Sequence, residues 1–219
     1  MDNKHKILIL VFIGLFFSVN LNAQNSSIKS FFKLPRPEKC WVISHPFKAK
    51  RAFKISKVTQ ALSDSIKNTN LLDGDANGGQ VDAFRHSYWM AILSKEIGVK
   101  AARKLGKKHE KGNYIYYKKH KYEDGTIPDE ISSEMDLFNN EIGITIFTNN
   151  KDASKIDIQK ATIQYIKEGR MRIIKKNDKG EFLDCKGNII SEAELKGKWK
   201  NNKCLIFSDG KCRNLHLYE

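Results

Sequence analysis

Apolar residues recur every three or four positions through much of the region 46–168, which is the repeat of amphipathic α-helices that share one core. Pro46 suits the first turn of such a helix, and Gly98 and Gly169 suit helix ends. The predicted helices cover residues 46–67, 81–97, 101–112, 131–147 and 154–168. This pattern predicts a mainly α chain with a multi-helix core domain at 41–170.

The helical repeat stops after residue 170. Runs of β-branched and aromatic residues alternate there with the turn signals DKG at 178–180 and KGN at 186–188. The stretch CLIFSDGKC at 204–212 offers a further strand and turn. We therefore expect a small β-rich C-terminal appendage, of the β-hairpin type, at 171–219.

The first 23 residues have the three-part plan of a secretory signal peptide. A weakly basic start, MDNKHK, precedes an unbroken apolar run at 7–17, and small and polar residues follow up to Ala23. The run is shorter than the roughly 20 residues that a membrane-spanning helix needs, and an uncleaved anchor is the alternative. The sequence thus predicts export to the periplasm or the medium, with an N-terminal tether at 24–40.

Positive charge is in large excess. The whole chain carries a formal net charge of +14, of which the predicted signal peptide holds +1. Such a surplus favours anionic partners, and in an exported protein an anionic envelope component or a phospholipid surface is a better fit than nucleic acid. Between 99 and 121, nine Lys and Arg residues and one acid precede or interleave tyrosines. A basic, tyrosine-rich loop at 112–129 would suit a membrane interface or remain a solvated loop.

Four cysteines, Cys40, Cys185, Cys204 and Cys212, all follow the predicted signal peptide. An even number in an oxidising compartment predicts one or two disulfides. Because three of the four lie after residue 184, at least one bridge should hold the C-terminal appendage together. The three possible full pairings stay open, and the CxxC spacing of a structural zinc site is missing.

His86 stands where the helical pattern predicts an apolar residue. A buried imidazole costs free energy unless its nitrogens find partners, and Asp82 lies one helical turn before it. On the next predicted helix His109 shares a stripe with Leu105, and Glu110 follows it directly. Two predicted helices therefore turn imidazoles toward the same core.

A third predicted helix adds polar groups to this set. Its core stripe consists of Ile131, Met135, Phe138, Ile142 and Ile146. Asp136, Asn140 and Gly143 lie just beside that stripe. One interpretation is a hydrogen-bond network that fixes helix register. Burying two imidazoles, an acid and a carboxamide together is costly, however, and such costs persist mainly at functional sites.

The first chemical interpretation is a divalent metal site formed by His86, His109, Glu110 and Asp136, with zinc or manganese as the ion. The order of these residues is similar to that in the HD phosphohydrolases, which have Asp where this chain has Glu110. In that family the metal lowers the pKa of a bound water that attacks a phosphoester. His86, Glu110 and Arg85 are then the catalytic candidates: Glu110 or His109 would assist the water, and Arg85 would hold the substrate's charge.

The second interpretation is a calcium loop. Residues 73–79, DGDANGG, match the first half of the EF-hand pattern with Asp73, Asp75 and Asn77, but Phe84 stands where that pattern ends in a carboxylate. A glycine-rich loop before a histidine helix is also similar to the secreted phospholipases A2, where calcium holds the phosphate and His activates water. In those enzymes an Asp follows the His, whereas here Ser87 does. An ordinary polar turn is the alternative.

Three sequence blocks, NGGQVDAFRHSYW, KKHEKGN and EMDLFNNEIG, occur in this order between about residues 73 and 147. They resemble a bacterial family catalogued as domain of unknown function 6973, whose hallmarks are DAFRHAxW, an HE pair and MDxxNNxxG. The resemblance implies a signature set of Asp82, Arg85, His86, His109, Glu110, Asp136, Asn139 and Asn140. It brings no assigned activity. Trp89, inside the first block, is expected to be a core or site-wall residue.

These observations lead to two hypotheses from different classes. The first is an exported, metal-dependent hydrolase of a phosphoester or phospholipid in the cell envelope, with Asp82, Asn139, Asn140 and Trp89 around the site. The alternative is a non-catalytic protein that binds the envelope or another anionic surface and whose buried polar network is structural. The presence of a bound metal discriminates between them.

Overall fold

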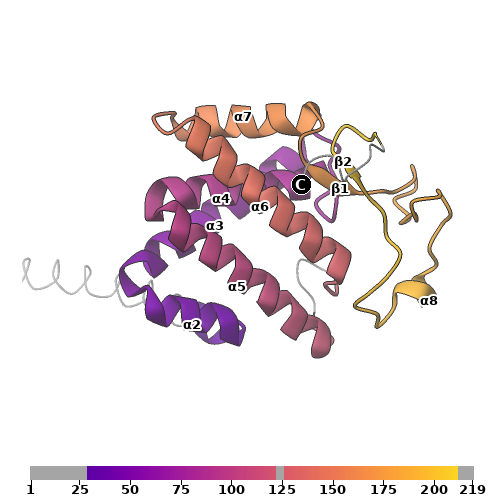
Figure 1. Cartoon of the computed structure of the whole chain (residues 1–219), viewed down its shortest axis with the longest axis horizontal. Helices are drawn as coiled ribbons and strands as arrows, with labels where there is room; N and C mark the ends of the chain where they lie inside the picture. Colours follow the sequence, from indigo (N-terminus) through magenta and orange to yellow (C-terminus); the bar gives the residue numbers. More distant parts are fainter. Residues whose placement is uncertain (1–28, 122–125, 212–219) are drawn as a thin grey trace, which may run out of the picture.

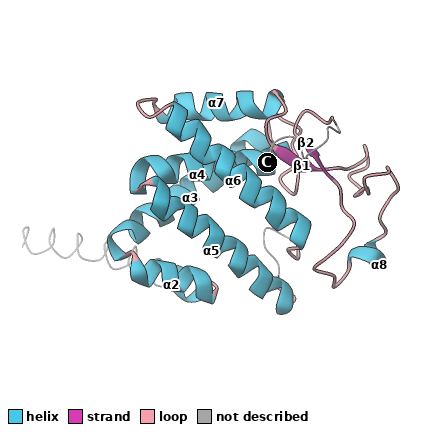
Figure 2. Cartoon of the chain, in the orientation of Figure 1, coloured by secondary structure: helices cyan, strands magenta, loops and turns pink. Residues whose placement is uncertain are grey.

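The computed structural model describes residues 29–121 and 126–211, and it is mainly helical, as predicted (Figures 1 and 2). Helix α4 (Gln80–Ile97) is the central element, and most of its length is buried. The helices that contact it are α3 (Pro46–Lys67), α5 (Val99–Lys118), α6 (Glu130–Asn149) and α7 (Lys155–Lys167). Among the described residues, no helix is both long enough and apolar enough to cross a bilayer.

Local signals in the sequence explain where several helices begin and end. The Asp129 side chain accepts a hydrogen bond from the backbone N–H of Ser132, whose hydroxyl accepts one in return from the Asp129 N–H, so the pair forms a capping box for α6. Ser154 caps α7 in the same position. Helix α4 ends at Gly98, whose φ of +87° strongly favours glycine.

The N-terminal tether predicted at 24–40 does not extend beyond residue 35, because residues from 36 onward form helix α2 (Arg36–Ser44). Trp41 explains the difference: it is 1% exposed, and its indole N–H donates to the Ala101 carbonyl oxygen at 3.2 Å. Pro35 adds a second contact by packing on Gly112 of α5. A segment with such anchors is part of the core domain. The predicted signal peptide, 1–23, lies outside the described residues.

The loop predicted at 112–129 is also wrong at its start, because α5 continues to Lys118. Gly112 does not end the helix. A Cβ at that position would lie 2.5 Å from Cγ of Pro35, so the glycine serves a close approach between α5 and the start of α2. Tyr114, Tyr116 and Tyr117 are helical residues, and the hydroxyl of Tyr117 donates to the Gly197 carbonyl oxygen.

The C-terminal region forms the small β-rich appendage that the sequence predicts. Strand β1 (Arg172–Ile174) pairs antiparallel with β2 (Leu205–Phe207), and the four-residue helix α8 (Glu192–Leu195) lies between them in sequence. Isolated bridges close the two predicted turns, at 176–182 and 183–189. The strands are thus separated by a long connection, and the expected simple hairpin is replaced by a two-stranded sheet with a looped insertion.

A disulfide joins Cys185 to Cys204 and so links one of these turns to the residue before β2. This confirms the prediction of a bridge within the appendage. Cys40 is an exposed free thiol, and Cys212 lies outside the described residues. Ile174 and Leu205 pack against Met135 of α6, which fixes the sheet to the helical domain.

Candidate functional site

The loop before α4 is held in shape by its own side chains. Asp73 accepts hydrogen bonds from the backbone N–H groups of Asp75 and Gln80, and Asp75 accepts one from that of Asn77. Burial raises the pKa of the Asp73 carboxyl, against the lowering effect of these N–H groups. The loop ends at Gly78, whose N–H donates to Oδ2 of Asp82 at 2.7 Å. The loop therefore orients the first acidic side chain of α4.

The predicted calcium ligands Asp73, Asp75 and Asn77 do not form a calcium site in this structure. The ammonium of Lys176, from the C-terminal appendage, donates to Oδ2 of Asp75 at 2.5 Å and to the carbonyl oxygen of Asn77 at 2.6 Å. The remaining carboxylate oxygens accept backbone N–H groups. An internal cation thus takes the place that the calcium interpretation gave to an ion, and the loop is a scaffold for α4.

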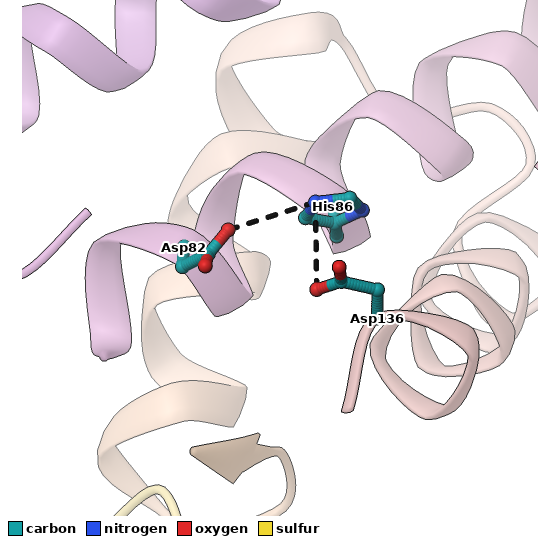
Figure 3. A group of neighbouring side chains, drawn as sticks. All are labelled: Asp82, His86 and Asp136. Carbon is teal, nitrogen blue, oxygen red and sulfur yellow. Dashed lines mark ion pairs between the residues drawn. The ribbon is translucent and has the colours of Figure 1, made fainter. Parts of the chain in front are cut away.

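Three potential metal ligands come together at the interface of α4 and α6, as Figure 3 shows. Nε2 of His86 lies 3.6 Å from Oδ1 of Asp82 and 3.4 Å from Oδ1 of Asp136. Asp82 and His86 share one face of α4 because they are one turn apart, and Asp136 reaches them from α6. One potential ligand atom from each of these three side chains lies within 4.8 Å of the other two. Among the described residues, this is the group of three or more His, Cys, Asp or Glu side chains that could hold a metal ion.

Burial sets the protonation of His86. Its side chain is 6% exposed, and this burial lowers the pKa of the ring well below its usual value near 6.5. The Arg85 guanidinium and the His109 ring lower the pKa further, while the Asn140 carboxamide raises it slightly. The imidazole is therefore neutral at neutral pH, which is the form that binds a metal ion.

The three residues fit a divalent ion. Metal bonds of about 2.0–2.2 Å to nitrogen and oxygen place neighbouring ligands roughly 3.0–3.4 Å apart, close to the separations around His86. Buried polar atoms nearby, namely Nδ1 of His86 and both amide atoms of Asn140, also have no hydrogen-bond partner among the described residues apart from the contact between these two side chains. Native proteins rarely leave buried polar atoms without hydrogen-bond partners unless there is a functional or structural reason. The buried group of Asp82, His86 and Asp136 could thus hold a metal ion.

The structure does not place the other two predicted ligands, His109 and Glu110, in this group. Nδ1 of His109 lies 3.1 Å from Oε1 of Glu38 on α2, and its ring centroid is 6.1 Å from that of His86. Glu110 is buried and accepts a hydrogen bond from the Asn113 amide, one turn along α5. His109 is therefore a neighbour of the candidate centre, and Glu110 belongs to a polar pair within α5.

A mainly apolar cavity of about 630 Å³ is lined by two residues that contact His109. Trp89 and Glu38, which both contact His109, are part of its wall. The rest of the wall is mostly apolar, with Phe53 and Trp41, but it also includes Lys50. The Trp89 indole N–H donates to the Ser56 hydroxyl, so this ring is fixed in place. Trp89 thus lines the cavity. Glu38 thus connects the cavity wall to His109, whose ring centroid is 6.1 Å from that of His86.

Arg85 and the two asparagines surround the group in different ways. Arg85 donates to Oδ1 of Asp82 at 2.6 Å and keeps 15% of its side chain exposed. Asn139 is fully buried and exchanges two hydrogen bonds with the backbone of Arg172, so it fastens β1 to α6. Asn140 points its amide toward the centre of the helical interface beside His86. Arg85 and Asn140 are therefore candidate site residues, and Asn139 is a structural one.

Sequence reasoning missed Glu38 and Lys176. Both act across more than 70 positions of the chain, Glu38 on His109 and Lys176 on the loop 73–79. Glu38 was hidden in a segment interpreted as a tether, and only the burial of nearby Trp41 could have indicated that this segment is packed. Lys176 is one of 39 Lys and Arg residues, so composition gives no signal that singles it out.

Residues 39–170 match the family described as domain of unknown function (DUF6973). The chain belongs to this family. The DUF6973 region spans most of α2 and helices α3 to α7, and it includes all three potential metal ligands, whereas the C-terminal appendage lies beyond it. No curated protein and no solved structure matches the chain.

Proposed function

We propose that this protein is an exported, divalent-metal-dependent hydrolase of a phosphoester, with Asp82, His86 and Asp136 as the protein ligands of the ion. The convergence of two carboxylates and a neutral imidazole at one buried helix interface carries this proposal. Such a set suits manganese or zinc. A divalent ion held there would lower the pKa of a bound water and stabilise negative charge on a phosphoryl oxygen.

The residues around the ligands have separate roles in this proposal. Arg85 is partly exposed at the edge of the group and would hold a phosphoryl oxygen of the substrate, since guanidinium pairs well with phosphate. His109, oriented by Glu38, would accept or donate a proton on the side of the cavity. In this proposal the His109–Glu38 pair takes the proton-transfer role that the sequence analysis also considered for Glu110.

The apolar cavity indicates the class of substrate. A volume of about 630 Å³ with mostly apolar walls is suited to the hydrocarbon part of a ligand. The Glu38 carboxylate stands at its wall, beside His109, so an acyl chain in the cavity would place its polar end near the candidate centre. We therefore favour a phospholipid over a small soluble phosphoester.

The decisive experiment measures metal and activity in matched variants. Wild-type protein purified without chelator should contain about one manganese or zinc ion per chain and hydrolyse bis(p-nitrophenyl) phosphate and a phospholipid. Asp136→Asn keeps the shape of the side chain but removes its charge, so it should lose the ion and the activity. The control is Asp152→Asn, an exposed acid after α6, which should change neither.

A second function has support from a different contact. Oδ2 of Asp82 accepts the Gly78 N–H and Oδ1 accepts the Arg85 guanidinium, so part of the cluster is satisfied without an ion. That favours a non-catalytic protein that binds an anionic surface and uses the cluster as a structural network. If the wild-type protein contains no metal and its melting temperature does not change with manganese, zinc or chelator, the hydrolase proposal is replaced by this one.

A further inference from the structure

Five cationic side chains surround one pocket of about 490 Å³ between the start of α2 and the end of α5. They are Lys33, Arg36, Lys39, Lys119 and Lys121. Among the described residues, no acidic side chain lines this pocket. Two segments that are about 80 residues apart in sequence thus bring like charges together. We call the pocket lined by these five side chains the cationic pocket.

Many other cations of this protein are paired. Arg51 and Lys155 both lie close to Glu96, and Arg103 binds Glu141 with two nitrogens. In the described part of the chain, none of the cations of the cationic pocket forms an ion pair. Like charges held around a concave surface raise the local potential and attract an anion from solution. The pocket therefore fits an anionic partner.

Apolar groups beside the cationic pocket narrow the class of partner. Phe32 lines the pocket and is 69% exposed. Leu34 lines both this pocket and the apolar cavity of the candidate site, so the two spaces lie on either side of one segment. Cations combined with an exposed aromatic ring are typical of a surface that enters the headgroup region of a bilayer.

The nearby aromatic residues do not favour a nucleic acid. Tyr114, Tyr117 and Trp199 contact one another, with ring centroids 4.9–6.2 Å apart. The hydroxyl of Tyr116 donates to the backbone oxygen of Lys33. Single-stranded nucleic acids bind where bases can stack on open aromatic faces. The Tyr114, Tyr117 and Trp199 rings instead contact one another, which leaves Phe32 as a single exposed ring at the pocket, without the row of open faces that successive bases need.

We propose that the segment 32–39 and the end of α5 form a docking surface for an anionic phospholipid bilayer. Headgroup phosphates occupy the cationic pocket, and the Phe32 ring lies among the upper parts of the acyl chains. The surface lies outside the candidate metal centre and needs no catalytic step. It would also place the part of the cavity wall formed by Phe31 and Leu34 near the lipid.

Co-sedimentation of the full chain with vesicles tests this proposal. The vesicles contain either phosphatidylcholine alone or phosphatidylcholine with phosphatidylglycerol. The protein should bind the anionic vesicles at least tenfold more tightly, and raised salt should weaken this binding. The double variant Arg36→Glu, Lys121→Glu should lose at least about tenfold in affinity. Phe32→Ser should lose several-fold without any change in charge.

The matched control is the double variant Lys100→Glu, Lys104→Glu, which makes the same charge change on an exposed part of α5. It should retain most of the binding, since it leaves the cationic pocket intact. Equal binding to neutral vesicles, or an equal loss in the control, would overturn the proposal. The proposal would also be overturned if the wild-type protein bound an RNA oligonucleotide tightly but did not bind vesicles, and if the pocket variant lost this RNA binding.

Two readouts separate this test from that of the proposed function. The pocket variants should keep the wild-type metal content and melting temperature, because none of the changed residues contacts the ligand group. Asp136→Asn should bind anionic vesicles as the wild type does. Failure of the vesicle experiment would thus leave the metal centre unaffected, and failure of the metal experiment would leave the docking surface unaffected.

Discussion

Single cations hold the acidic side chains of this protein in place. Lys203 donates to Oδ2 of Asp129 at 2.6 Å, and both side chains are about nine-tenths buried. Lys176 does the same for Asp75 and adds a bond to the Asn77 carbonyl oxygen. In both pairs the lysine comes from the C-terminal region and the acid precedes a long helix. Removing such a lysine leaves an acceptor without its partner, and the cost is largest where the acceptor is buried, as Asp129 is; Asp75 keeps 31% of its side chain exposed.

Lys176→Met should therefore lower the free energy of unfolding by about 1–3 kcal/mol. The aliphatic part of the side chain is kept, so the loss reports the two hydrogen bonds of the ammonium. Lys175→Met is the control, because this neighbouring lysine makes no ion pair in the described part of the chain. Chemical denaturation of the three proteins measures the difference. Equal stability of both variants would show that the ammonium is not important to the loop.

For single residues, the sequence predicts contacts within one helix better than contacts between helices that are far apart in sequence. Helical periodicity placed Asp82 and His86 on one face, and both are buried. Asp136 was predicted from the same period on α6, and it also reaches the group. His109 followed the same rule, but its ring turned to Glu38, a partner on a helix that the sequence had not indicated.

Helix α6 is rotated relative to the sequence prediction. Its expected apolar stripe includes Phe138 and Ile142, and both are only half-buried. The polar face with Asp136 and Asn140 is the one that is buried against α4. Gly143 explains this choice, since its lack of a side chain lets α6 approach the backbone of Ser87. Hydrophobic periodicity alone cannot detect a contact that depends on a missing side chain.

Gly143→Ala should separate α4 from α6. A Cβ at this position would lie 2.1 Å from the carbonyl oxygen of Ser87, which is backbone and cannot move aside. We expect a loss of about 1–3 kcal/mol or more in unfolding free energy, although alanine favours helices by about 1 kcal/mol over glycine. Since the two helices carry the three potential ligands, metal binding should weaken as well.

Gly106→Ala is the matched control for this prediction. Its new Cβ would lie 2.6 Å from Cε of Met90, the end of a flexible side chain that can rotate away, and 3.2 Å from Nδ2 of Asn140, which is also a side-chain atom. The change in unfolding free energy should therefore be clearly smaller than for Gly143→Ala. Thermal melts of both variants with and without added manganese measure the two effects. A larger loss for Gly106→Ala would refute the close-approach explanation.

The whole molecule joins two regions that the sequence predicted as neighbours. The mainly α domain and the small β-rich appendage both exist, because periodicity and turn signals are local properties. Their connection was not predictable, since it consists of contacts at long sequence separation. Ile174 donates its backbone N–H to the Gly78 carbonyl oxygen at 2.7 Å, and Gln80 donates to that of Ser208. The appendage thus holds the loop that orients Asp82.

Removal of the Cys185–Cys204 disulfide should therefore act at a distance. Cys185→Ser opens the bridge within the appendage, where a disulfide that closes a loop of this size contributes about 3 kcal/mol. The appendage should then open more often, and hydrogen exchange should increase first at 172–207. When the appendage is open, Lys176 and Ile174 would no longer contact the loop 73–79. Metal affinity should fall several-fold, although no ligand is changed.

The control is Cys40→Ser, which removes the exposed free thiol of α2 and should leave exchange and metal affinity as they are. Exchange within α4 should change little in Cys185→Ser, because this helix is buried by four other helices of the core domain. Faster exchange throughout α4 would mean that the appendage and the helices unfold as one unit. Unchanged metal affinity alongside faster exchange at 172–207 would mean that the loop keeps Asp82 in place by itself, through Gly78 and the carboxylate of Asp73.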